Sequence, residues 1–93
     1  MVKKAIRLII SGVVQGVFYR QFAKDEADRL DLKGFARNLE NGDVEVVAEG
    51  EEKNILKFSR MCRKGPDGSR VENIKEEKIK FSGEFGKFRV LKV

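Results

Sequence analysis

The first predicted strand, residues 5–10, has apolar residues at every second position, which is the side-chain repeat of an extended chain. Ile6, Leu8 and Ile10 fall on one side of this segment, and Ile9 falls on the other. A strand that is apolar on both sides is typical of the centre of a sheet. Ser11 and Gly12 end the pattern, so we expect a central, buried strand here.

The apolar spacing then changes to three or four residues, which predicts two helices. From Tyr19 onward the apolar residues fall on one stripe: Tyr19, Phe22, Ala23, Ala27 and Leu30. Gly34 is expected to stop this helix. The second helix is predicted over residues 51–64, which open with acidic and close with basic residues, as the helix dipole favours. Its inner stripe is predicted to comprise Ile55, Phe58, Ser59 and Cys62.

Four further strands are predicted, over residues 35–40, 43–49, 71–81 and 88–93. Asn41-Gly42 joins the first two, and this dipeptide readily supplies the positive φ angles of a tight hairpin, so these strands should pair antiparallel. The order β-α-β-β-α-β plus a terminal strand predicts a single domain over residues 1–93. The expected fold class is α+β, a ferredoxin-like split βαβ sandwich with two helices on one face of a mixed, mainly antiparallel sheet.

Net charge narrows the choice of partner only slightly. Lys and Arg number 20 against 15 Asp and Glu, for a formal net charge of +5. An anionic partner is favoured, but nucleic acid, a membrane surface and a small phosphorylated molecule all satisfy that condition. Opposite charges are interspersed along the chain, as is typical of solvated faces.

The absence of histidine limits the available chemistry. Histidine is the commonest metal ligand and general base, and the chain has none; its one cysteine, Cys62, is expected to be a small core residue. We therefore expect no metal and no cofactor. No apolar stretch approaches the length of a membrane span, and no cleavage site follows the N-terminus. These features predict a cytoplasmic protein with no membrane partner.

The segment that joins the first strand to the first helix carries the candidate chemistry. No Ser, Thr, Asp or Asn stands directly before the helix to cap it, while Gly12 and Gly16 allow the backbone to curl. Successive N–H groups that lead into a helix form an anion-binding nest, and Arg20 would add a guanidinium that grips two phosphate oxygens. An ordinary strand-to-helix turn with a solvated Arg20 has the same spacing, so this pattern alone is a weak signal.

Two segments together resemble the acylphosphatase family. Residues 9–20, "IISGVVQGVFYR", fit its first signature: aliphatic, any, Gly, any, Val-Gln-Gly-Val, any, aromatic, Arg. Tyr19 stands where the family usually carries Phe. Residues 34–50, "GFARNLENGDVEVVAEG", match the second signature at each fixed position, with Asn38 as its asparagine. The resemblance covers nearly the whole chain, because family members are single small domains with the same element order.

The resemblance implies an enzyme that hydrolyses the carboxyl-phosphate bond of small acyl phosphates and releases inorganic phosphate. It implies that Arg20 binds the phosphate and that Asn38 orients the attacking water. It also implies a phosphate cradle made by the main chain of six residues: Gln15, Gly16, Val17, Phe18, Tyr19 and Arg20. A monomer is the expected state.

This chemistry suits a site that lacks histidine. The leaving group is a carboxylate, whose low pKa removes the need for a general acid. What remains is to hold the phosphoryl group, to neutralise its charge and to aim a water in line. The Asn38 amide has a donor and an acceptor, enough to orient a water but not to deprotonate it. The resemblance implies that the water's proton passes to a phosphate oxygen of the substrate.

Two other functions remain open at this point. The RNA-recognition module shares the element order, but it stacks bases on exposed aromatic residues of a central strand. Here the corresponding segment, "DVEVVAEG", has no aromatic residue and carries Glu45 and Glu49, so we expect no nucleic-acid partner. A regulatory domain that senses a phosphorylated ligand would keep the cradle without turnover, and only an activity assay excludes it.

Overall fold

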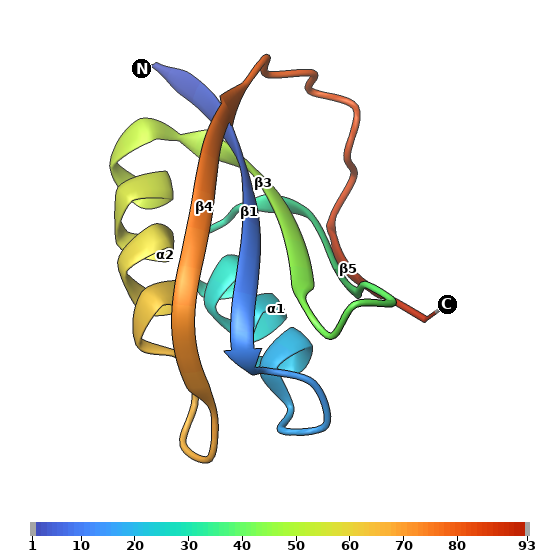
Figure 1. The fold of residues 1–93 in the computed structure, drawn as a ribbon. Helices are drawn as coiled ribbons and strands as arrows, with labels where there is room; N and C mark the ends of the chain where they lie inside the picture. Colours follow the sequence, from blue (N-terminus) through green and yellow to red (C-terminus); the bar gives the residue numbers. More distant parts are fainter. Residues whose placement is uncertain (1, 93) are drawn as a thin grey trace.

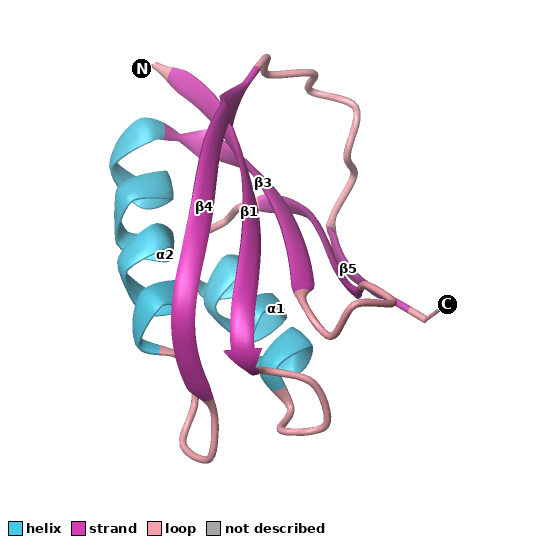
Figure 2. Cartoon of the chain, viewed as in Figure 1, coloured by secondary structure: helices cyan, strands magenta, loops and turns pink. Residues whose placement is uncertain are grey.

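Five strands form one mixed sheet, and both helices lie against the same face of it (Figure 1). The computed structural model describes residues 2–92. The elements follow in the order β1 (Lys3–Val13), α1 (Tyr19–Arg29), β2 (Lys33–Asn38), β3 (Val44–Glu51), α2 (Glu52–Lys64), β4 (Arg70–Ile79) and β5 (Phe88–Leu91). The predicted order and fold class are confirmed, including the terminal strand (Figure 2).

Strands β1 and β3 pair side by side inside the sheet, and each contributes three residues to the core. The strand order is β4-β1-β3-β2-β5, and every pair is antiparallel except β2 with β5. Ile6, Leu8 and Ile10 of β1 are buried beneath the helices, as the alternation predicts. The strand is longer than the predicted 5–10, because its polar ends pair with β3 and β4 through the backbone alone.

Each helix buries the stripe that faces the sheet. In α1 the buried residues are Tyr19, Ala23 and Ala27, and in α2 they are Ile55, Phe58, Ser59 and Cys62. The α2 stripe is the predicted one, whereas Phe22 of the predicted α1 stripe is only half-buried. Within residues 2–92, no helix combines the length and apolar character needed to cross a membrane.

The prediction that Gly34 stops the first helix is wrong. The helix ends at Arg29, and Asp31, with φ 56°, makes the turn that follows. Gly34 lies inside β2, where a Cβ atom would stand 1.9 Å from the carbonyl oxygen of Val47 on β3. This glycine is therefore required by the close approach of two strands rather than by a helix end.

The β2–β3 hairpin pairs antiparallel as predicted, but its turn differs in detail. The Leu39 N–H donates to the Asp43 carbonyl at 2.8 Å, and of the Asn41-Gly42 pair only Gly42 has a positive φ, 97°. Other boundaries differ as well: β2 begins and ends earlier than predicted, Glu51 belongs to β3 and not to α2, Phe81 lies beyond the end of β4, and the last strand is Phe88–Leu91. Val93, which the prediction placed in that strand, lies outside the described residues.

The face of the sheet opposite the helices carries buried carboxylates. Glu45 and Glu49 of β3 are 4% and 3% exposed and alternate with the core residues of that strand. Glu49 accepts hydrogen bonds from the Ser82 N–H at 2.7 Å and the Gly83 N–H at 3.0 Å. These bonds tie the β4–β5 connection to the centre of the sheet. Figure 1 shows this connection as the long orange and red segment that leads to β5.

Candidate active site

The loop between β1 and α1 leaves the sheet at a glycine that no other residue could replace. At Gly12, with φ 127°, a Cβ atom would stand 2.1 Å from the Arg70 carbonyl oxygen on β4. Gly16 and Phe18 also have positive φ values, 74° and 59°. This succession of turns curls the backbone of residues 14–18 in front of α1, as the two glycines predict.

The N-terminus of α1 has no protein cap among the described residues. Phe18 is the N-cap residue and makes no side-chain capping bond. The first bond into the helix runs from the Phe22 N–H to the Phe18 carbonyl at 3.0 Å. Within residues 2–92, the N–H groups from Gly16 to Arg20 find no protein acceptor. These open donors stand at the positive end of the helix dipole, an arrangement that suits an anion.

Arg20 is held at the edge of this loop by the last strand. Its Nη1 donates to the Leu91 carbonyl at 2.9 Å, and the side chain is half-buried. This bond fixes the guanidinium at the C-terminal end of β5 and leaves the rest of its fork for a ligand. A planar fork held in this way can bind two oxygens of one phosphoryl group.

Asn38 ends β2 next to Arg20 and has an unusual feature. Its Oδ1 atom is buried, and no donor among the described residues reaches it. A buried carbonyl oxygen without a partner is costly, because it has lost its hydrogen bonds to bulk water. Such an atom is well suited to accept a bond from a water or a ligand bound in the site.

A hollow of about 310 Å³ joins these groups. Five of the predicted site residues line it: Gly16, Phe18, Tyr19, Arg20 and Asn38. The Tyr19 ring is buried in the core, and its hydroxyl donates to the Cys62 carbonyl at 2.5 Å, which gives the extra oxygen of this tyrosine a partner. The two segments that carry the signatures, far apart in sequence, therefore meet at one pocket.

Gln15 and Val17 do not line the hollow. Val17 packs against the core. The Gln15 amide donates to the Leu39 and Asp43 carbonyls, both at 2.8 Å. Their predicted part in phosphate binding thus rests on the main chain alone. The Gln15 side chain instead ties the loop to the hairpin that follows Asn38.

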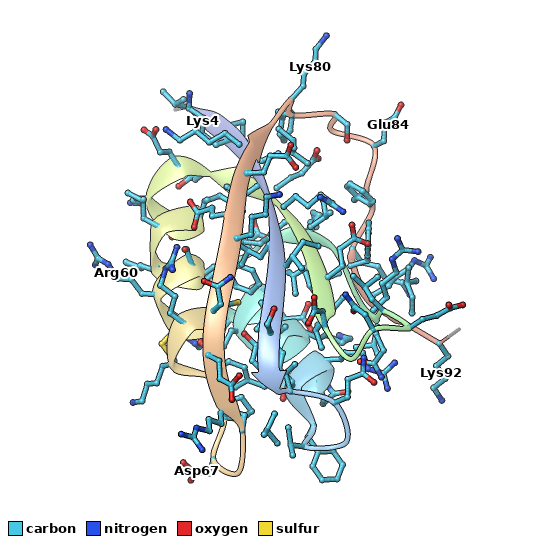
Figure 3. The ribbon with its side chains drawn as sticks, in the orientation of Figure 1. Lys4, Arg60, Asp67, Lys80, Glu84 and Lys92 are labelled. Atoms are coloured by element: carbon cyan, nitrogen blue, oxygen red, sulfur yellow. The ribbon has the colours of Figure 1, made fainter. Side chains whose placement is uncertain are left out.

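Lys92 also lines the hollow, and the sequence did not single it out. It follows β5 at the C-terminal end of the described chain (Figure 3). It borders a second, adjoining hollow of about 530 Å³ as well, together with Arg20, Asn38, Leu39 and Glu40. Only its position after a strand parallel to β2 could have indicated this, because a lysine near a chain end carries no pattern.

The charged side chains of Arg7, Arg37 and Glu45 pair with one another on the sheet and do not line the hollow. Burial favours the protonated form of Glu45, but hydrogen bonds from Arg7 and Arg37 outweigh it and lower the pKa of this carboxyl. Arg37, the neighbour of Asn38 in the second signature, is thereby directed to the opposite face. Among residues 2–92 no group of three Cys, Asp or Glu side chains is placed to hold a metal ion.

Comparisons with known proteins identify the family to which the chain is similar. The acylphosphatase family model matches residues 6–90. The chain is 42% identical over 84 residues to the acylphosphatase of Anaeromyxobacter dehalogenans, covering 90% of each protein. It is 38% identical over 86 residues to that of Dehalococcoides mccartyi, covering 91% of this chain and 94% of the relative.

Solved structures give the same result. An acylphosphatase from Coxiella burnetii superimposes with a TM-score of 0.91 at 37% identity, covering 96% of this chain and 93% of the other. The crystal structure of acylphosphatase from Bacillus subtilis gives a TM-score of 0.92 at 31% identity, with 96% and 99% covered. The family model matches nearly the whole chain, and the relatives and solved structures are covered over nearly their full length as well, so this chain belongs to the acylphosphatase family.

Proposed function

We propose that Arg20, Asn38 and the loop of residues 15–20 carry out the hydrolysis of acyl phosphates in this chain. Family membership gives the activity itself: the chain is a hydrolase that acts on small acyl phosphates. One observation supports the division of roles. The open N–H groups from Gly16 to Arg20, the Arg20 fork and the unpartnered Asn38 oxygen border one hollow.

The phosphoryl group would sit on the open N–H groups and the Arg20 guanidinium. In the transition state its charge spreads over oxygens that already face these donors, so stabilisation needs no rearrangement. The bond from Arg20 to the Leu91 carbonyl restricts the guanidinium before substrate arrives. Preorganised donors of this kind are the main source of rate enhancement in phosphoryl transfer.

Asn38 would hold the nucleophile. A water that donates one hydrogen to the Asn38 Oδ1 atom keeps a lone pair that can point at the phosphorus. The amide does not take the proton, which passes to a phosphoryl oxygen as the new P–O bond forms and the P–O bond to the acyl group breaks. The leaving carboxylate departs with the electron pair and needs no proton, because carboxylic acids have pKa values near ~4.

The cofactor requirement, the oligomeric state and the location of this protein are proposed from fewer observations. The donor set around Arg20 is complete for a phosphoryl group, so we propose that turnover requires neither metal nor cofactor. The chain is proposed to act as a single domain over residues 1–93 and as a monomer. We also propose a cytoplasmic location.

No nucleic-acid or membrane partner is proposed. The sheet face that an RNA-recognition module would use carries the buried Glu45 and Glu49, and the β4–β5 connection is bound to Glu49. Stacked bases would have to displace this connection and approach two carboxylates. Both conditions oppose the binding of a polyanion.

The test compares two substrates in the presence of EDTA. Acetyl phosphate should be hydrolysed with the rate unaffected by the chelator, and phenyl phosphate should be a poor substrate because phenolate, with a pKa near ~10, leaves far less readily. A loss of activity in EDTA that a divalent ion restores would exclude the metal-free mechanism. Binding of phosphate without turnover of either compound would identify a phosphate sensor instead.

A further inference from the structure

Phe18 combines two features that are each unfavourable for a phenylalanine. Its backbone has φ 59° and ψ 25°, a left-handed conformation that glycine adopts freely and a bulky residue does not. Its side chain is 84% exposed, the highest value among the large apolar residues that the structure finds exposed in residues 2–92. Neither the core nor the backbone therefore explains an aromatic residue at this position. Strained residues of this kind cluster at ligand-binding sites.

The position of Phe18 relative to the catalytic groups suggests what the ring contacts. Phe18 lines the first hollow together with Arg20 and Asn38, but it does not line the second one, which Asn38 also borders. Asn38 thus borders both hollows, whereas Phe18 borders the first one alone. Apolar contacts are available on the Phe18 side, because Val14 and Val90 line the first hollow too.

In-line attack then determines where the acyl group lies. The attacking water and the leaving oxygen stand on opposite sides of the phosphorus. If Asn38 holds the water, the acyl group leaves from the side of the phosphorus away from Asn38. Among the residues that line the first hollow, Phe18 carries the exposed aromatic ring, since the Tyr19 ring is buried in the core.

We infer that the Phe18 ring contacts the acyl group of the substrate and gives this chain a preference for acyl phosphates with an aromatic or large apolar acyl group. The inference rests on the proposed function of the loop and of Asn38, and it makes Phe18 a specificity-determining residue. Contact with an apolar acyl group removes the exposed ring from water, and two rings in an offset or edge-to-face arrangement gain a further attraction.

The experiment measures kcat/KM for benzoyl phosphate and for acetyl phosphate and uses their ratio. Damage to the cradle lowers both values alike and cancels in the ratio. Phe18→Gly and Phe18→Asn remove the ring with residues that tolerate the left-handed conformation, and each should lower the ratio by about fivefold or more. Phe18→Tyr keeps the ring and should keep the ratio. Because glycine relieves the backbone strain, the melting temperature of Phe18→Gly should not fall below that of the unmodified protein.

Leu56→Ala is the matched control, since it removes another exposed apolar side chain, 54% exposed, from α2. This variant should leave the ratio and both activities unchanged. A ratio that stays the same in Phe18→Gly and Phe18→Asn would overturn the inference, and would favour a role of the ring outside catalysis. If the unmodified protein hydrolyses neither substrate, the proposed function itself fails, and that result is distinct from an unchanged ratio.

Discussion

At the scale of single residues, the site depends on polar atoms that the fold leaves open or ties down. The Asn38 Oδ1 atom is buried without a partner, whereas the Arg20 guanidinium is fixed by the Leu91 carbonyl. The sequence identified both residues through the two signatures. It could not show that one amide oxygen is left open and that one guanidinium N–H is already used, because both facts depend on strands distant in sequence.

The Tyr19 hydroxyl is another polar group whose partner the sequence could not identify. It donates to the Cys62 carbonyl of α2 inside the core. We expect Tyr19→Phe to lower the free energy of unfolding by about 1 kcal/mol, because the buried carbonyl loses its donor. Urea unfolding of both proteins measures this difference, and equal stabilities would show that the bond contributes nothing.

The buried thiol of Cys62 should make the free energy of unfolding depend on pH in the alkaline range. Burial raises the pKa of its thiol from 9.0 to about 12, and burial likewise raises the pKa of Tyr19 above 10.0. A raised folded-state pKa contributes stability that is complete below the unfolded-state value and is lost as the pH rises above it. The free energy of unfolding should therefore fall by roughly 1.4 kcal/mol per pH unit just above pH 9, where one thiol titrates in the unfolded chain.

Urea unfolding of the unmodified protein and of Cys62→Ala between pH 8 and about 10 tests this slope. The alanine variant starts from a lower stability, because it leaves a small cavity, but its stability should change much less over this range. Parallel pH profiles for the two proteins would contradict the assignment to Cys62.

At the scale of elements, two connections bring the signatures together. The β1–α1 loop supplies the cradle, and the β2–β3 hairpin follows Asn38. Gln15 joins them through its bonds to the Leu39 and Asp43 carbonyls. The sequence predicted both connections from their glycines, but it assigned Gln15 only to the cradle, since a glutamine side chain gives no indication of its direction.

Gln15→Leu should loosen this junction. It keeps the approximate size of the side chain and removes both donors, so we expect a loss of about 1–2 kcal/mol in the free energy of unfolding. Amide hydrogen exchange should become faster in residues 13–18 and in the hairpin, while α2 is unaffected.

Gln21→Leu is the control for this change. Gln21 makes a single exposed bond to Asp25 on the same helix, so its loss should cost only a few tenths of a kcal/mol. Exchange rates that rise no more in Gln15→Leu than in Gln21→Leu would show that the junction does not hold the loop.

At the scale of the whole molecule, the order of elements and the central position of β1 followed from hydrophobic spacing. Spacing also predicted the inner stripe of α2. The prediction from the sequence failed at Gly34. This glycine is required by a close contact between two strands and not by the end of a helix. The prediction also failed at the ends of β1, which pair through the backbone with no apolar signal. Lys92 could not be predicted at the site, because its position depends on how β5 pairs with β2.

Binding of phosphate should stabilise the folded chain as a whole. In the proposed site the anion would bind the cradle only when α1 and the loop are formed, so it should add stability as its concentration rises. At about one hundred times the dissociation constant the gain is about 2.7 kcal/mol, which a thermal melt detects readily.

Sodium chloride at matched ionic strength is the control for this melt. The net charge is +5, and any salt reduces the repulsion among these charges. An equal rise in melting temperature with chloride would attribute the effect to screening and not to a site.

The most direct test of the assigned roles is the phosphate inhibition constant measured together with kcat for Arg20→Lys and Asn38→Ala. In the proposed mechanism Arg20 binds oxygens that are charged throughout the reaction, so its variant should bind phosphate more weakly and lose at least ~100-fold in kcat. Asn38 is proposed to act on the water alone, so its variant should keep phosphate affinity within about a factor of three while kcat collapses. If Asn38→Ala weakens phosphate binding as much as Arg20→Lys does, or retains near-normal turnover, the assigned roles are contradicted.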